Sequence, residues 1–154
     1  MDFHQTSSFS MNAMRTHKLV IVRIGRYLIS NPDRGVIYTV NKSRSLEVYV
    51  DADFSSGWKM ADSTNAENVI SRTGFVIRYS GCPIIWSSKL QTEIALSTAE
   101  AEYIAMYQAL LEALPVQILA KETNCIVPLC APTTMFCLTV HEDNLSSISM
   151  AEYL

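Results

Sequence analysis

Three acidic residues stand where an α/β protein would gather ligands for metal ions. Asp51 ends one apolar run, Glu102 lies one turn into a helical pattern, and Asp143 ends a second apolar run. Strand ends and the first turns of adjacent helices meet at one edge of an α/β sheet, so these carboxylates are expected close together. Carboxylates gathered in this way repel one another unless a cation joins them, and their hard oxygen atoms suit Mg²⁺ or Mn²⁺. Two such ions about 3.5–4 Å apart can support phosphodiester cleavage.

Each carboxylate also has a structural interpretation when it is taken alone. Asp51 is suited to end a strand, Glu102 to favour the helix dipole, and Asp143 to cap the last helix. The pair Asp51 and Asp53 after an apolar strand also fits an unrelated phosphohydrolase, with Asp51 as nucleophile and Asp53 as acid/base. The residues by themselves leave these alternatives open.

The elements that would position these residues follow from the hydrophobic periodicity. Leu46, Val48 and Val50 alternate with polar residues, which predicts a strand over 46–53. A helix is predicted over 17–30, with Thr16 as its N-cap and Asn31-Pro32 as its stop. Further strands are predicted at 36–40, 73–80, 83–88 and 135–141, with a turn at 81–83 and helices at 96–114 and 146–154. Consecutive strands followed by a strand–helix–strand unit predict a mixed sheet covered by helices.

The helix at 96–114 is the clearest element in the chain. Ser97 and Glu100 have the spacing of a capping box at its start. One face of this helix is expected to hold Ala101, Ile104, Ala105 and Gln108, continued by Leu111. We interpret the aromatic residues Trp86, Tyr103 and Tyr107 as core residues rather than as platforms for stacking bases.

Charge and composition restrict the class of protein. The net charge is −3, yet residues 15–44 carry seven Lys/Arg against one acid, and residues 45–154 carry five against thirteen. A basic segment beside an acidic domain could meet a polyanion on one side and a cation on the other, although a solvated helix face explains the basic residues equally well. The four cysteines form no CxxC pair, which favours reduced, buried residues, and a zinc site from Cys130, Cys137 and His141 has an uncommon spacing. No apolar run is expected to be long enough for a membrane span.

Several motifs together resemble a known family. YVDADFSSGW (49–58), SRTGFVIRYSGCPIIWSSKLQTEIALSTAEAEYIAM (71–106) and HEDNLSSI (141–148) resemble the ribonuclease H domain of copia-type retrotransposon Pol polyproteins. Upstream, THKLVIVRIGRYLISNPDRGVIY (16–38) resembles the stretch that links the polymerase to that domain. The resemblance spans about residues 9 to 150, and its motifs come in the family's order.

The resemblance implies a fold, two regions and a set of site residues. The fold would be an α/β, ribonuclease H-like mixed sheet, with three antiparallel strands, then a parallel strand, and covering helices. Residues 1–44 would be the tail of the reverse transcriptase, and 45–154 the ribonuclease H-like domain without its last strand and helix. Asp51, Glu102 and Asp143 would be the catalytic, metal-binding carboxylates, with Asp53 and Glu100 in second rank. Nucleic-acid contacts would come from Arg15, Lys18, Arg23 and Arg26.

The resemblance also implies an activity and its partners. Similar enzymes use Mg²⁺ or Mn²⁺ to cut the RNA strand of RNA–DNA hybrids, and they recognise RNA by its 2′-hydroxyl. The partners would be the hybrid and the missing polymerase region, without a membrane, in cytoplasmic virus-like particles or the nucleus. The family's fourth carboxylate lies in a final strand and helix that have no counterpart here, and Phe54 replaces a usual tryptophan. We therefore expect a weak or inactive nuclease, or a remnant that binds nucleic acid without cutting it.

Overall fold

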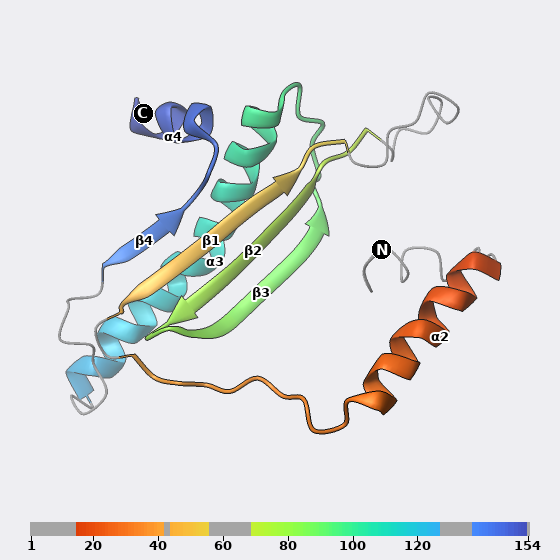
Figure 1. The fold of residues 1–154 in the computed structure, drawn as a ribbon. Helices are drawn as coiled ribbons and strands as arrows, with labels where there is room; N and C mark the ends of the chain where they lie inside the picture. The colour runs from red at the N-terminus through yellow and green to blue at the C-terminus, as the bar shows by residue number, and fades with distance from the viewer. Residues whose placement is uncertain (1–14, 42–43, 56–68, 127–136, 154) are drawn as a thin grey trace. The chain divides into compact units, whose positions relative to one another are not determined.

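The computed structural model describes residues 15–41, 44–55, 69–126 and 137–153, which form three helices and four strands. Along the chain the order is α2, β1, β2, β3, α3, β4 and α4 (Figure 1). The chain divides into two compact units, Met1–Ile37 and Tyr38–Leu154. Apart from one predicted strand, at 36–40, this is the order that the sequence predicts. Which residues derive from a polymerase stays a prediction.

The first unit contains α2 (Arg15–Ser30). The helix ends as predicted, because Asn31 precedes a proline and therefore avoids the helical region. The Asn31 side chain donates a hydrogen bond to the Tyr27 carbonyl (2.8 Å) and so satisfies one of the last helical acceptors. The prediction of Thr16 as N-cap is wrong, because the helix already includes Arg15. The four basic residues predicted to contact nucleic acid are exposed on this helix: Arg15, Lys18, Arg23 and Arg26.

The second unit is built on a mixed sheet with strand order β3-β2-β1-β4. The strands β1 (Leu46–Asp53), β2 (Arg72–Tyr79) and β3 (Cys82–Leu90) are antiparallel neighbours, and β4 (Leu138–His141) pairs with β1 in parallel. The predicted combination of three antiparallel strands and one parallel strand is confirmed. Part of the predicted last strand, residues 135 and 136, lies outside the described residues.

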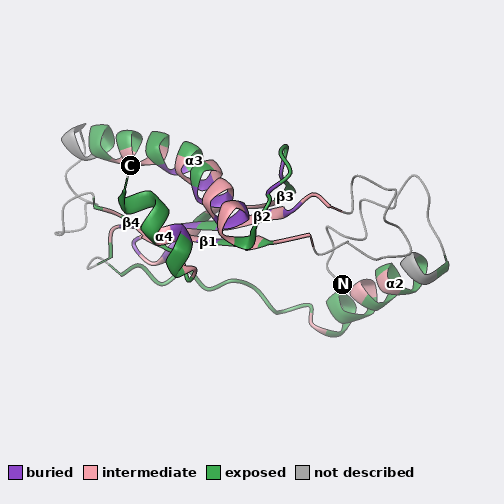
Figure 2. Cartoon of the chain, turned by 90° about the horizontal axis from the view of Figure 1, so that it is seen from above, coloured by how far each residue is buried: buried purple, intermediate pink, exposed green. Residues whose placement is uncertain are grey.

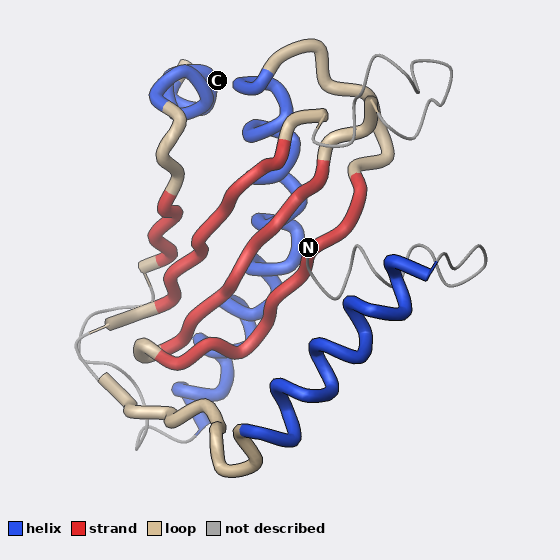
Figure 3. Tube along the Cα trace, turned by 45° about the vertical axis from the view of Figure 1, so that its right-hand side comes forward, coloured by secondary structure: helices blue, strands red, loops and turns tan. Residues whose placement is uncertain are grey.

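The long helix α3 (Thr98–Ile126) lies across one face of the sheet (Figure 3). Val48, Ile77 and Phe75 point from β1 and β2 into the core that this helix covers. Figure 2 shows that parts of α3 are buried. A row of fully buried alanines on α3 allows the helix backbone to approach the sheet closely: Ala101, Ala105, Ala109 and Ala113. The last helix, α4 (Leu145–Glu152), contacts α3. Both helices therefore belong to the layer that the sequence predicts.

The turn between β2 and β3 is one residue earlier than predicted. Ser80 and Gly81 form it with positive φ values of 50° and 80°, while Cys82 and Pro83 already belong to β3. Glycine adopts such a conformation without the steric cost of a Cβ atom. The Arg78 side chain donates two hydrogen bonds to the Gly81 carbonyl, at 3.1 and 2.6 Å, and closes the turn.

Two expectations about elements are wrong. Residues 36–40 form no strand, because this apolar run has no ladder partner in the described part of the chain. The helix predicted to end at Leu114 continues to Ile126 through Pro115, whose missing N–H removes one bond without ending the helix. On the helix face predicted from the sequence, Ala101 and Ala105 are buried, whereas Leu111 is 54% exposed.

The interpretation of the aromatic residues as core is wrong for two of them. Trp86 is 66% exposed and Tyr107 59% exposed, whereas Tyr103 is half-buried against the core. Trp86 is opposite Val76 in the β2–β3 ladder, on the face of the sheet away from α3. The expectation of buried cysteines is met by Cys82 but not by Cys137, which is exposed; neither forms a disulfide.

The expectation that no segment could span a membrane is also wrong by length and composition. Residues Thr98–Thr123 of α3 have a mean hydropathy of 1.3 in their most apolar window, which is enough to cross a bilayer. Apolar residues of this helix also pack within the fold, because the alanines of α3 are buried against β1 and β2.

Candidate metal centre

Strand β1 brings Asp51 to the edge of the sheet. Its apolar residues face α3, so the alternation places Asp51 and Asp53 on the opposite, exposed side. The antiparallel register sets Asp51 opposite Gly74 and Asp53 opposite Arg72. Asp53 is therefore the last residue of β1 and lies two residues beyond Asp51 on the same face.

The start of α3 fixes Glu102. One half of the predicted capping box is present, since Glu100 N donates to Ser97 Oγ (3.1 Å). The Glu100 side chain accepts instead from the backbone N–H of Leu96 (2.7 Å), the residue before Ser97. Glu100, a second-rank candidate, thus has a structural role in capping. Two residues later, Glu102 is only 8% exposed, and one of its carboxylate oxygens has no hydrogen-bond partner in the described structure.

A buried glutamine connects this helical turn to the sheet. Gln91 follows β3 and is 3% exposed. Its side-chain amide donates to the Ala101 carbonyl (2.8 Å) and to Thr73 Oγ1 (3.2 Å), and its backbone N–H donates to Ser71 O (2.9 Å). These bonds join β2, the end of β3 and the turn of α3 that carries Glu102.

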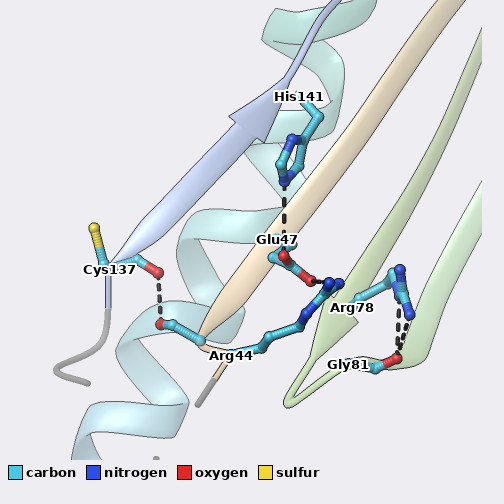
Figure 4. A network of polar contacts seen from close by, with 7 residues as sticks. Arg44, Glu47, Arg78, Gly81, Cys137 and His141 are labelled. Carbon is cyan, nitrogen blue, oxygen red and sulfur yellow. Dashed lines mark hydrogen bonds and ion pairs between the residues drawn. The ribbon is translucent and has the colours of Figure 1, made fainter. Parts of the chain in front are cut away.

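Strand β4 is held beside β1 by side chains as well as by its ladder. Ser45 Oγ donates to the Cys137 carbonyl (2.6 Å) at the start of the pair. Further along, the rings of Tyr49 and His141 stack with centroids 4.3 Å apart. Glu47 lies 3.7 Å from His141 Nε2, and the same carboxylate bonds Arg44 at 3.4 Å (Figure 4). This network fixes the position of the residues that follow β4.

The residues after β4 form a polar corner before α4. Asn144 is the N-cap of α4 and accepts hydrogen bonds from Ser146 N (2.9 Å) and Ser147 N (3.1 Å). The interpretation of Asp143 as the helix cap is therefore wrong, because the neighbouring asparagine takes that role. Asp143 is exposed, and Glu142 is half-buried.

Carboxylates from the helix and from this corner converge. One ligand atom each from Glu102, Glu142 and Asp143 lie within 4.8 Å of one another. A surface pocket of about 450 Å³ is lined by Asp51, Glu142 and Asp143, together with Tyr49, Val50 and His141. The pocket opens beside the carboxylates that the sequence singled out.

The electrostatics reflect this crowding. Burial, with smaller contributions from the charges of Glu142, Asp51 and Asp143, raises the pKa of Glu102 from the usual 4.5 to about 7, although a hydrogen bond from the Ala52 backbone lowers it. Burial is also the main cause that raises the pKa of Glu142, opposed by the hydrogen bond from Asn144 N. Negative charges are therefore concentrated here without a cation among the described side chains that neutralises them.

Of the three first-rank carboxylates, the structure thus groups Glu102 and Asp143 with Glu142, while Asp51 lines the pocket beside Glu142 and Asp143. The assignment of these carboxylates as metal ligands stays a prediction. Glu142 was not among the predicted residues. The alternation of buried and exposed residues in the strand, continued by one residue past His141, could have indicated it. Leu138, Val140 and Glu142 all lie on the more buried side of this segment. The proposed zinc ligand Cys130 lies outside the described residues.

Comparison with known proteins shows to which family the chain belongs. It is 30% identical over 118 residues to the secreted RxLR effector protein 161 of Plasmopara viticola, a match that covers 77% of this chain and 78% of that protein. The chain belongs to the same family as this protein.

The chain is also similar to parts of much longer proteins. The chain is 32% identical over 87 residues to the retrovirus-related Pol polyprotein from transposon RE2 of Arabidopsis thaliana. It is 45% identical over 60 residues to that from transposon TNT 1-94 of Nicotiana tabacum. These matches cover 56% and 39% of the chain but only 5% and 4% of the polyproteins. No family model and no solved structure matches the chain.

Proposed function

We propose that this chain is part of a copia-type retrotransposon Pol polyprotein and carries a ribonuclease H-like, metal-dependent nuclease site. The similarity to plant transposon polyproteins supports the retrotransposon origin. The observation that carries the nuclease proposal is the convergence of carboxylates around Glu102, whose buried oxygen has no partner in the described structure. A buried anionic oxygen without a partner is costly, and a cation would remove that cost.

The donor set fits a hard divalent cation. All the converging ligands are carboxylate oxygens, which suit Mg²⁺ or Mn²⁺. When two such ions are bound, they supply water activation and stabilise the leaving oxygen in phosphodiester cleavage. Because Asp51 and Asp143 are exposed beside the pocket, a phosphodiester of the RNA strand could reach them from solvent.

The chain's own residues have distinct tasks in this proposal. The hydrogen bonds of Ser97 and Gln91 hold the first turns of α3 in place, and Glu102 lies in these turns. Glu102 would therefore be the buried ligand of the cation. Asp51 and Asp143 would complete the ligand set from the two strand ends. The substrate would be an RNA–DNA hybrid, with phosphates bound in addition by basic residues of α2.

A cleavage assay tests the proposal. The chain is incubated with a labelled RNA–DNA hybrid and Mg²⁺ or Mn²⁺, beside Asp51→Asn and the matched control Glu112→Gln, which changes an exposed acid elsewhere on α3. We expect slow cleavage of the RNA strand, reduced at least about 100-fold by Asp51→Asn and unchanged in the control. Cleavage that Asp51→Asn leaves intact would contradict the proposed site.

The Plasmopara viticola match favours a second candidate function. That protein is named a secreted effector, and the match covers most of both chains. The second candidate function is a nucleic-acid-binding domain without cleavage. In that case the folded chain would bind the hybrid with equal affinity with or without Asp51→Asn and would cut it under neither condition.

A further inference from the structure

Glu142 differs from its acidic neighbours in how its two oxygens are used. The side chain follows β4 and is half-buried. Its Oε1 accepts a hydrogen bond from Asn144 N (3.1 Å), which fixes the carboxylate within the corner before α4. Its Oε2 is buried and has no hydrogen-bond partner in the described structure.

Glu102 offers a second oxygen of the same kind from a different element. It is more than nine-tenths buried, and its Oε2 also lacks a partner in the described structure. The two side chains and Asp143 place their ligand atoms within 4.8 Å of one another. Buried polar atoms are almost always hydrogen-bonded, so two unpartnered carboxylate oxygens on side chains that converge require an explanation.

We propose that Glu142 is a further metal ligand of this chain and binds one divalent cation together with Glu102 and Asp143. The inference rests on the proposed function and adds a residue that none of the sequence motifs assigned. Such an ion would satisfy both buried oxygens at once, and water would complete its coordination. Together with Asp51, Glu102 and Asp143, Glu142 would be the fourth carboxylate of the proposed site. It lies in the polar corner before α4, where the hydrogen bond from Asn144 N holds it in place.

Mn²⁺ binding to the full chain tests the inference without reference to cleavage. Free Mn²⁺ is followed by electron paramagnetic resonance for the unchanged chain, Glu142→Gln, Asp51→Asn and the control Glu112→Gln. Glutamine retains an oxygen that can accept from Asn144 N, so the corner should keep its fold. We expect Glu142→Gln to weaken Mn²⁺ binding about tenfold or more and Glu112→Gln to leave it unchanged.

The outcomes separate the inference from the function on which it rests. Mn²⁺ binding that Asp51→Asn weakens and Glu142→Gln leaves unchanged would overturn the role of Glu142 and retain the proposed site. Absence of Mn²⁺ binding in the unchanged, folded chain would overturn both. If circular dichroism shows that Glu142→Gln is unfolded, Glu142→Asp replaces it in the test. Weaker Mn²⁺ binding by Glu142→Asp would support the role of Glu142 as a ligand, because a shortened ligand no longer reaches the ion. Unchanged Mn²⁺ binding would overturn that role.

Discussion

At the scale of single residues, Glu102 makes stability depend on pH. Its pKa is about 7 in the folded chain and 4.5 when unperturbed, so between these values the folded state binds more protons than the unfolded state. Stability of the metal-free chain therefore falls as pH rises from about 4.5 to about 7. We expect Glu102→Gln to remove most of this fall and to stabilise the metal-free chain at pH 8 by about 1–3 kcal/mol. Urea unfolding at pH 5 and pH 8 measures both effects.

The same experiment has a metal-dependent counterpart. If the proposed site binds Mg²⁺ through its deprotonated carboxylates, saturating Mg²⁺ should stabilise the unchanged chain at pH 8 and have little effect on Glu102→Gln. A fall in stability between pH 5 and pH 8 that is as large in Glu102→Gln as in the unchanged chain would refute the assignment of this pKa.

Residue types and spacing predicted part of this site. Asp51, Glu102 and Asp143 were found because each stands at a strand end or in the first turn of a capped helix, positions that local patterns reveal. Glu142 was missed because the predicted strand stopped at His141, so its alternation was not continued by one residue. Trp86 was misjudged for another reason: an aromatic residue in a strand has two faces available, and hydrophobicity alone favours the covered one.

At the scale of elements, Gln91 is the clearest target. Its side chain joins the sheet to the first turns of α3 from a buried position, so removal of the amide leaves the Ala101 carbonyl and Thr73 hydroxyl without this donor. We expect Gln91→Met to lower the free energy of unfolding by about 1–3 kcal/mol. Thr73→Val, which removes only one of the two acceptors, should cost about 1 kcal/mol. Urea unfolding compares the two, and equal stability of Gln91→Met and the unchanged chain would show that the link is unimportant.

The elements themselves were predicted well where periodicity was sustained. The strand at 46–53 and the end of α2 at Ser30 agree with the structure, since alternation and a proline act locally. The apolar run 36–40 has the composition of a strand but pairs with none of the strands that the structure describes, because pairing is a tertiary property that the run does not encode. The continuation of α3 beyond Pro115 depends on the helix formers that follow, which together outweigh one missing hydrogen bond.

At the scale of the whole molecule, the basic residues lie on α2 in the first unit and the carboxylates in the second. We expect simultaneous Gln substitution of Arg15, Lys18, Arg23 and Arg26 to weaken hybrid binding and to flatten its dependence on salt, because each lost phosphate contact removes about 0.9 from the slope of log K against log salt for a duplex. Fluorescence anisotropy at several salt concentrations measures this slope.

The matched control for that experiment is metal affinity. Mn²⁺ binding should be the same in the quadruple variant and the unchanged chain, because the proposed ligands all lie beyond residue 37. An unchanged salt slope in the variant would indicate that the basic side of α2 is a solvated face without a role in binding nucleic acid.

We expect the candidate site to form late in folding, because it depends on the parallel pairing of β1 with β4. Ser45 and Cys137, which begin this pair, are 92 residues apart, and β4 is an edge strand of four residues. Contacts between distant residues close slowly, and short edges open first by local unfolding. Each opening of β4 would carry Glu142 and Asp143 away from Glu102 together. A bound cation should therefore slow amide hydrogen exchange in β4 selectively, while β2 and β3 exchange as before.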